Sequence, residues 1–261
     1  MPKSLVVSRR SMTRRCILPL LVLWGCAQAA TAAELSVWSA GATKPPMEEL
    51  VSRFQASTGH KLSVDYAPVG VLLRRLAAGG RPDVLLVSAE VVAEVERQNW
   101  AVVGSAVPVG SVGIGVAVKV GATQPDISSP EALRQTLLNA QSITYMDPQK
   151  GTSGKHFAAV LEQLGIASQV QAKTKLGDVG FVVEPVAKGE IEIGIQQITE
   201  ILPVQGAVLV GPLPGGLQKI TTYSALLGTG AQAQPAAAEF IRYLQTPQAT
   251  VVFERTGFKR P

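Results

Sequence analysis

Two neighbouring hydroxyl residues, Thr152 and Ser153, lie in the segment DPQKGTSGKHFA, directly after the apolar run SITYM. A strand that ends in Asp, Pro and Gly and continues into a helix places free backbone N–H groups beside these hydroxyls. Two interpretations fit the pattern. Either Ser153 caps the helix and has no further role, or the turn is half of an anion pocket. The flanking Gly151 and Gly154 favour the pocket, because glycine lets the backbone approach a ligand closely.

Small, polar turns of the same kind follow other predicted strands. They are SAGAT at 39–43, QQIT at 196–199 and SAE at 88–90. In open α/β sheets, ligands bind beyond the carboxyl ends of the strands and against helix N-termini. We therefore expect these turns to line a cleft between two lobes, with Lys44 close enough to attract an anion. The candidate ligand-binding residues of the turns are Ser39, Ala40, Gly41, Thr152, Ser153, Gly154 and Gln197.

The residue types that most catalytic sites need are sparse. The chain has two His residues, His60 and His156, in unrelated turns, and no Cys beyond residue 33. It also lacks the G-x-S-x-G, H-E-x-x-H and P-loop motifs. Neither a catalytic triad nor a metal site assembles from these residues. We predict that the protein is not an enzyme and has no metal or other cofactor.

The first 33 residues have the pattern of a secretory signal peptide. Five cations precede the apolar run CILPLLVLWGC, and small residues follow it. This run is far shorter than the ~20 residues of a membrane span. We predict an exported protein whose mature chain begins between Ala30 and Glu34. The stretch SRRSMT leaves twin-arginine export open, and LWGC leaves open a lipoprotein anchored at Cys26, which Trp24 disfavours.

Removal of this segment changes the charge of the protein. The five cations of the segment are among the 24 Lys and Arg, so the mature chain has as many cations as its 19 Asp and Glu. The sequence pI of about 9.3 is therefore a property of the signal and gives no case for nucleic-acid binding. Both Cys residues also lie in the signal, so the stability of the mature chain must come from core burial.

A unit of apolar strand, small polar turn and amphipathic helix recurs along the mature chain. This alternation predicts an α/β architecture with mainly parallel sheets. The alternating apolar residues of 111–120 predict a longer strand that passes between lobes. Strands are expected at 34–38, 61–66, 82–88, 111–120, 142–146, 171–176 and 191–195, and helices at 45–57, 69–78, 89–98, 129–140, 153–164 and 179–189.

Five segments, taken in order, resemble one known family. They are SVWSAGATKPPMEELVSRFQASTGHKLSVDY, GGRPDVLLVSAE, DPQKGTSGKHF, GEIEIGI and FIRYLQTPQATVVFERTGF, and together they span essentially the whole mature chain. They are similar to the periplasmic substrate-binding proteins of ABC importers, specifically the molybdate-binding type. The resemblance implies a two-lobed α/β fold that closes around one small oxyanion, and an ABC permease in the inner membrane as a partner. We expect a monomer.

The resemblance also implies a division of the chain into domains. After the signal peptide at 1–33, lobe 1 is expected to comprise 34–113 plus 222–261, because the C-terminal helices of the family return to the first lobe. Lobe 2 is expected to comprise 114–221.

In lobe 1, the resemblance assigns ligand contacts to two turns. Ser39 matches the first pocket serine of the family, in the turn after the first strand. The second pocket serine belongs near Val69 and Gly70, where this chain has no hydroxyl. That contact is either missing or replaced by a backbone N–H.

In lobe 2, the resemblance assigns three further positions. Thr152 and Ser153 stand where the family presents a backbone N–H to the oxyanion, and Gly180 or Phe181 stands near another backbone donor. Gln197 replaces the pocket tyrosine of the family. Its amide can both donate and accept, which suits a carboxylate or hydroxyl better than a bare oxyanion.

These departures leave the binding role intact and widen the range of ligands. We predict capture of a small anion, either a molybdate-type oxyanion or a small organic acid, and its delivery to an ABC importer. Presentation of a small organic acid to a membrane sensor is the alternative.

Overall fold

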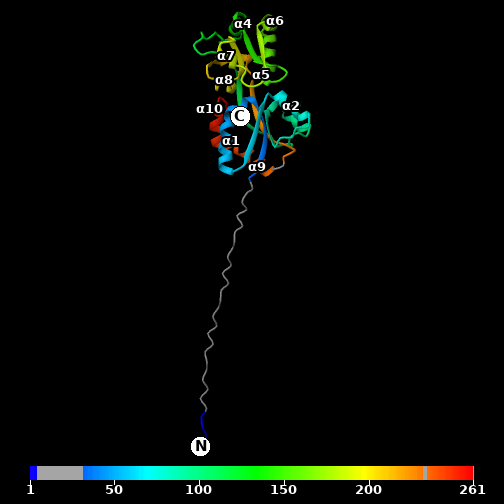
Figure 1. Ribbon diagram of the computed structural model, residues 1–261, viewed down its shortest axis with the longest axis vertical. Coiled ribbons are helices and arrows are strands. Elements are labelled where there is room, and N and C mark those ends of the chain that lie inside the picture. Colours follow the sequence, from blue (N-terminus) through cyan, green and yellow to red (C-terminus); the bar gives the residue numbers. More distant parts are fainter. Residues whose placement is uncertain (5–31, 232–233, 261) are drawn as a thin grey trace. The chain divides into compact units, whose positions relative to one another are not determined.

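The computed structural model of this protein describes residues 1–4, 32–231 and 234–260. The twin-arginine stretch and Cys26 lie outside these described residues, so both predictions about them stay predictions. Residues 32–261 group into one compact unit by their contacts, and Figure 1 shows the helices and strands of this unit. In the part of the chain that is described, no helix is long and apolar enough to cross a membrane.

The strands form one continuous path of paired neighbours. Strand β4 (Val107–Lys119) is the longest and lies near the middle of the path, where β8 (Ala207–Pro212) also pairs with it. The complete order is β2 (Lys61–Ala67), β1 (Glu34–Ala40), β3 (Val84–Ser88), β9 (Ile220–Leu227), β4, β7 (Ile193–Gln197), β5 (Ile143–Met146) and β6 (Thr174–Gly177).

The sheet is mixed, which corrects the expectation of mainly parallel pairing. Strand β1 pairs in parallel with β2 and β3, and β5 pairs in parallel with β6 and β7. In contrast, β9 pairs antiparallel with β3, and β4 pairs antiparallel with β7, β8 and β9. The strand-turn-helix units account for the parallel pairs. Every antiparallel pair contains β4 or β9, the two strands that lie between the parallel groups.

Strand β4 passes from one hydrophobic core to another, as predicted for the strand at 111–120. Its residues up to Gly113 pair with β9, and its residues from Ile114 onward pair with β7 and β8. Val112 belongs to a core built from residues of 35–112 and 223–258, here called the first core. Ile114 belongs to a core built from residues of 114–217, here called the second core.

The helices lie close to the predicted positions. Ser129 caps α4 by accepting a hydrogen bond from the Ala132 N–H at 3.1 Å, and Gly59 ends α1 with φ 77°. The bounds are α1 (Lys44–Thr58), α2 (Val69–Ala77), α3 (Val92–Arg97), α4 (Pro130–Asn139), α5 (Thr152–Gln163), α6 (Ala167–Gln171), α7 (Glu184–Lys188), α8 (Ile198–Ile201), α9 (Gln234–Tyr243) and α10 (Pro247–Arg255), with the 3-10 turns η1 (Gly41–Thr43), η2 (Ala89–Val91) and η3 (Gly215–Leu217).

Three details differ from the sequence prediction. Helix α5 begins at Thr152 with Gly151 at its N-cap, so Ser153 is not a capping residue. The helix expected at 179–189 is reduced to α7, because residues 179–180 form a bend and residues 182–183 form a turn. Elements β8, β9, α6 and α8 were not predicted.

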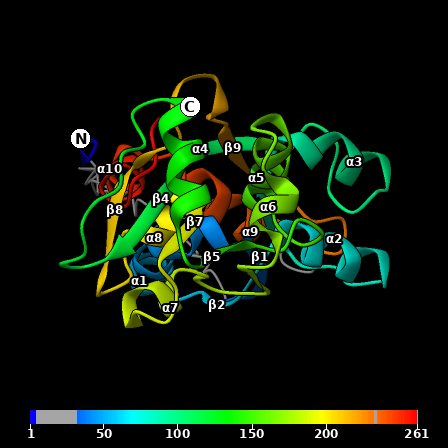
Figure 2. The ribbon, with the colours of Figure 1, turned by 90° about the horizontal axis from the view of Figure 1, so that it is seen from above.

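The connections around β1 and β5 determine where a ligand can bind. From β1 the chain moves outward to β2 through α1, and then returns across β1 to β3 through α2. Right-handed crossovers in opposite directions put α1 and α2 on opposite sides of the sheet, as Figures 1 and 2 show. The strands β5, β6 and β7 repeat this pattern. The carboxyl ends of the two central strands, β1 and β5, are therefore topological switch points, where α/β proteins bind ligands.

Candidate functional site

A cavity of about 280 Å³ lies at the carboxyl ends of β1, β2, β5 and β7. Its wall includes residues of the turns after β1 and β5, which are the two switch points. The wall residues come both from the part of the chain that builds the first core and from the part, 114–217, that builds the second core. The volume is close to the lower end of the range for small-molecule sites, about 300–1,000 Å³. The cavity therefore suits a small ligand.

Three helices begin at this cavity. Their first residues, Lys44 of α1, Val69 of α2 and Thr152 of α5, all line it. The first N–H groups of a helix have no partner within the helix, and the aligned peptide dipoles give the N-terminus a partial positive charge. Three N-termini at one cavity favour an anionic ligand.

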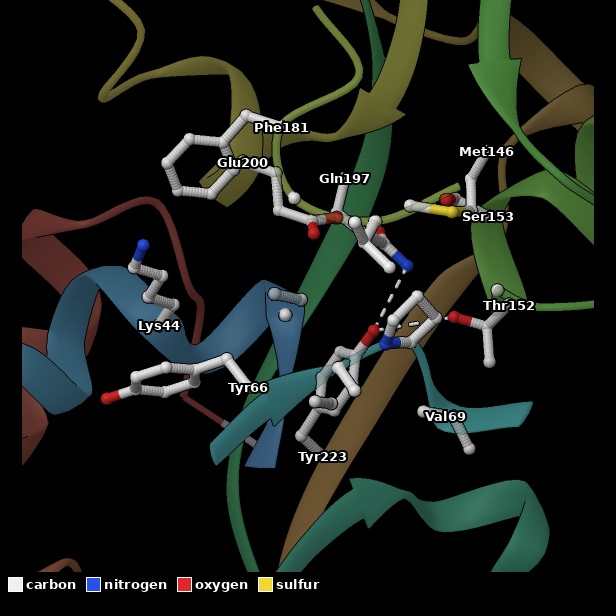
Figure 3. A pocket seen from close by; sticks show the side chains of 18 of the residues that line it. Lys44, Tyr66, Val69, Met146, Thr152, Ser153, Phe181, Gln197, Glu200 and Tyr223 are labelled. Carbon is white, nitrogen blue, oxygen red and sulfur yellow. Dashed lines mark hydrogen bonds between the residues drawn. The ribbon is translucent and has the colours of Figure 1, made fainter. Parts of the chain in front are cut away.

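A cluster of neutral polar groups covers one end of the cavity (Figure 3). The Tyr223 hydroxyl lies 3.4 Å from Thr152 Oγ1 and accepts a hydrogen bond from Gln197 Nε2 at the same distance. Burial raises the pKa of Tyr223, so its hydroxyl stays protonated. Gln197 Oε1 is buried, and it has no hydrogen-bond partner among the described residues. The cluster therefore offers an acceptor as well as donors.

A cation lies away from this cluster, at the other end of the cavity in Figure 3. Lys44 Nζ lies 5.9 Å from the ring centre of Tyr66 and 5.4 Å from that of Phe181. Glu48 is its ion-pair partner at 3.8 Å, and the Lys44 side chain keeps 40% of its surface exposed. This partly exposed ammonium group can meet an anionic group of a ligand while the two rings hold it in place.

Glu200 contributes a buried carboxyl group to the cavity wall. Burial raises its pKa to about 8, and hydrogen bonds from the Gln196 side chain and the Gln197 backbone offset part of this rise. The carboxyl reaches the turn after β1, where a Cβ added to Gly41 would lie 2.8 Å from Glu200 Oε1. A larger residue at position 41 would require the end of the Glu200 side chain to shift.

Seven of the ten predicted site residues line the cavity. They come from both switch-point turns, from the start of α2, from the loop before α7 and from the end of β7. These residues are Ala40, Gly41, Val69, Thr152, Ser153, Gly180 and Gln197. Their contact with a ligand stays a prediction.

The structure places the other three predicted residues outside the cavity wall. Ser39 is fully buried, and its hydroxyl lies 2.5 Å from Thr43 Oγ1 within the turn. The Gly70 N–H donates to the Lys150 carbonyl at 2.8 Å, so it does not replace the missing serine hydroxyl. Gly154 packs against the end of β5, where a Cβ would lie 1.8 Å from the Met146 carbonyl oxygen. These three residues shape or join the walls.

Other lining residues were missed by the sequence analysis. Tyr66, Glu200 and Tyr223 all line the cavity. Glu200 follows Gln197 by three residues between the apolar Ile198 and Ile201, and a lone carboxylate in such surroundings was a usable signal. Tyr223 had no such signal, because its strand was not predicted. Among the residues described, no group of three or more His, Cys, Asp and Glu could hold a metal ion.

Residues 35–259 match the family described as bacterial extracellular solute-binding protein. The chain belongs to this family. It is 31% identical to aconitate isomerase of a Pseudomonas species, over 86% of this chain and 87% of that protein. It is 26% identical to a molybdate-binding protein of Azotobacter vinelandii, over 88% of this chain and 91% of that one.

Solved structures of such proteins share the fold. The periplasmic molybdate-binding protein of Azotobacter vinelandii superposes with a TM-score of 0.73 at 18% identity, covering 87% of this chain and 99% of that one. The sulfate-binding protein of Mycobacterium tuberculosis superposes with a TM-score of 0.70 at 17% identity, covering 87% and 86%. The predicted two-lobed periplasmic-binding-protein fold is confirmed. The lobe boundaries stay a prediction.

Proposed function

We propose that this protein binds a small organic acid in the cavity and delivers it to an ABC importer. The observation that carries the proposal is the mixture of groups in the wall. Three helix N-termini and Lys44 favour negative charge in the ligand. The unpartnered Gln197 Oε1 and the Glu200 carboxyl oppose it.

A tetrahedral dianion such as molybdate fits this mixture poorly. Above neutral pH, all four of its oxygens are acceptors, so Gln197 Oε1 gains no hydrogen bond from it. The position of the missing second serine offers the apolar Val69, and the Gly70 N–H is already bonded to Lys150. A carboxylic acid has separate anionic and apolar parts, so its anionic groups can meet the donors while its carbon skeleton meets Val69 and Met146.

The same proposal covers the setting of the protein. The family is extracellular, and we propose that this member is periplasmic, exported by its N-terminal segment and monomeric. The importer permease is its proposed partner. Neighbouring genes for a permease and an ATPase would support import over presentation to a membrane sensor.

A thermal-shift screen of the mature protein, refolded after removal of any bound ligand, tests the proposed ligand class. Small mono-, di- and tricarboxylates should be compared with molybdate, tungstate, sulfate and phosphate. A ligand at about 100 times its dissociation constant stabilises by about 2.7 kcal/mol, which raises Tm by several degrees. We expect this rise from a carboxylate. An unchanged Tm with every anion would contradict the anion pocket itself.

Isomerisation of an unsaturated tricarboxylic acid is a second candidate function. The observation that favours it is Glu200, a carboxyl in the cavity wall whose pKa is raised to about 8 by burial, together with the 31% identity to aconitate isomerase. A group that titrates close to neutral pH is suited to both accept and return a proton. This candidate modifies the sequence-based prediction that the protein is not an enzyme.

The chemical step needs no co-reactant. The Glu200 carboxylate would take a proton from the methylene carbon of aconitate, and the electron pair would delocalise over the neighbouring double bond and carboxylate. Return of the proton to the far carbon of this allylic system would complete a double-bond shift and regenerate the Glu200 carboxylate. Proton NMR of trans-aconitate in D₂O tests this step through loss of the methylene signal and growth of the cis isomer. Binding without either change would leave only the transport function.

A further inference from the structure

The Glu200 carboxyl is enclosed by elements of both cores. Its helix α8 follows β7, and Ile198 of the same helix packs against the first core. The side chain reaches across to the turn after β1, where Gly41 leaves room for Oε1. Glu200 is only 6% exposed. The cavity wall therefore includes a carboxyl group that water scarcely reaches.

The charged groups around Glu200 do not neutralise the negative charge that its carboxylate would carry. The titratable residues that line the same cavity are Lys44, Tyr66, Glu184 and Tyr223. The Lys44 ammonium is paired with Glu48 on α1. Strands β7 and β8 and the turn η1, which pack against α8, carry no titratable residue, and β4 carries only Lys119. Helix α1 also packs against α8, and its charged residues are Lys44, Glu48, Glu49 and Arg53. Glu49 pairs with Arg53 and Arg255. Among the described residues, no ion pair neutralises the Glu200 carboxyl.

A purely structural role does not explain this placement. Glu200 is the third residue of α8 and accepts a hydrogen bond from the Gln197 backbone, as in a capping box. An ionised carboxylate in contact with water would stabilise the N-terminus of α8 at least as well. Burial of the carboxyl in a ligand cavity instead favours its neutral form, which has an O–H group to donate.

We propose that Glu200 is a specificity residue that stays protonated in the occupied cavity and donates a hydrogen bond to a carboxylate of the ligand. The site then takes up an organic anion together with one proton when Glu200 is ionised beforehand. This inference rests on the proposed binding of an organic acid for transport, and it is an alternative to the second candidate function, in which Glu200 meets the ligand as a carboxylate. It explains how a carboxyl group can line an anion site, since an O–H donor attracts the anion that a carboxylate would repel.

Calorimetric titration with propane-1,2,3-tricarboxylate tests the proposal. This saturated acid has no double bond to isomerise, so the heat reports binding alone. Titrations at pH 7 and pH 9, each in two buffers of different ionisation enthalpy, give the number of protons taken up. At pH 9 we expect uptake of about one proton per ligand, and an affinity that falls about tenfold per pH unit above the pKa of Glu200. At pH 7 the uptake should be much smaller.

Two variants identify the residue that takes up the proton when the ligand binds. Glu200→Gln keeps a donor in place, so it should bind without proton uptake and with an affinity that is the same at both pH values. Glu184→Gln removes the exposed carboxylate of the cavity wall and should keep the proton uptake of the wild type. Uptake that persists in Glu200→Gln, or that disappears in Glu184→Gln, would overturn the assignment.

If a variant fails to fold, the titrations of the wild-type protein still test the proposal. Binding at pH 9 without proton uptake would overturn the role of Glu200 and leave the binding function standing. No binding of any carboxylate at either pH would overturn the organic-acid function, and this inference with it.

Discussion

At the residue scale, Thr152 is the hydroxyl best suited to a test of ligand contact. It lines the cavity from the start of α5, and among the described residues its hydroxyl has one partner, the Tyr223 hydroxyl at the long distance of 3.4 Å. Thr152→Val should therefore leave the fold intact and remove one hydrogen bond to a charged ligand. Such a loss is about 1.5–3 kcal/mol, or roughly 10- to 150-fold in affinity. Calorimetric titration of both proteins measures it.

Ser39→Ala is the contrasting variant. The Ser39 hydroxyl is buried against Thr43 and does not line the cavity, so its removal should lower the free energy of unfolding by about 1 kcal/mol. Urea unfolding measures this loss. A large loss of affinity in Ser39→Ala, with none in Thr152→Val, would restore the contact that the family resemblance implies and remove the one that the cavity favours.

Glu200 should also make the stability of the protein depend on pH. Its pKa is about 8 in the folded protein against an ordinary 4.5. Between these two pH values the folded state keeps a proton that the unfolded state has lost. Stability from this group is therefore fully present below the unfolded pKa and falls by up to about 1.4 kcal/mol per pH unit until the folded pKa is passed.

Glu200→Gln should remove this dependence. Thermal unfolding between pH 5 and pH 9 should show a smaller fall in Tm for the variant than for the wild type, and the variant should be the more stable protein at pH 9. Parallel curves for the two proteins would show that Glu200 ionises like a solvated carboxylate.

Residue-scale prediction from sequence worked where a residue lies within a turn that the strand-helix pattern identifies. Thr152, Ser153 and Gln197 follow predicted strands and line the cavity. Tyr223 reaches it from β9, which returns from the far end of the chain, and no local pattern indicates that return. Ser39 was predicted in the turn after the first strand, but it belongs to the end of β1. The direction of its hydroxyl depends on Thr43, which the pattern does not resolve.

At the element scale, the start of α2 contacts the turn between β5 and α5. The Gly70 N–H donates to the Lys150 carbonyl, and Arg74 Nη1 donates to the Gln149 carbonyl at 3.2 Å. A second contact between the two sides of the cavity is the ion pair of Lys219, which precedes β9, with Glu90 of η2 at 2.6 Å. We infer that these contacts hold the two sides of the cavity together.

Gly70→Ala tests this contact. A Cβ at position 70 would lie 2.8 Å from the Lys150 carbonyl oxygen, which belongs to the backbone and cannot swing away. Overpacking of this kind costs about 1–3 kcal/mol, so ligand affinity should fall by roughly 5- to 150-fold. Helix α2 itself should not weaken, because alanine favours the helix more than glycine does.

Gly216→Ala is the matched control. No atom lies within 4 Å of the Cβ position at Gly216, and its φ is not in the left-handed region. Its affinity for the ligand should equal that of the wild type. Equal affinity in Gly70→Ala would show that the α2 contact does not hold the cavity closed.

Whole-molecule organisation was partly readable from the sequence. The recurring strand-turn-helix unit predicted the α/β class, and the alternation around Val112–Val118 predicted the strand that links the two cores. The antiparallel half of the sheet was not predicted, because β8 and β9 lie beyond the last strand-helix unit. The change of core near residue 113 and again between 217 and 223 leads us to propose lobe boundaries at these positions.

Ligand binding should change the shape of the whole molecule. The cavity wall takes residues from two parts of the chain, 40–69 with Tyr223 and 146–200, so neither part alone encloses a ligand. Closure of two lobes around a ligand is the expected response of such a site. Small-angle scattering of the ligand-free mature protein should give a larger radius of gyration than the same protein with saturating trans-aconitate. An unchanged radius would indicate a rigid, preformed site.

The most direct test of the central claim is a calorimetric titration of the ligand-free mature protein at pH 7 with trans-aconitate and, separately, with molybdate. We expect one saturable site for the tricarboxylate, an affinity that falls in Thr152→Val, and no comparable binding of molybdate. Tight binding of molybdate with no response to trans-aconitate or any other carboxylate would contradict the claim that the cavity is built for an organic acid.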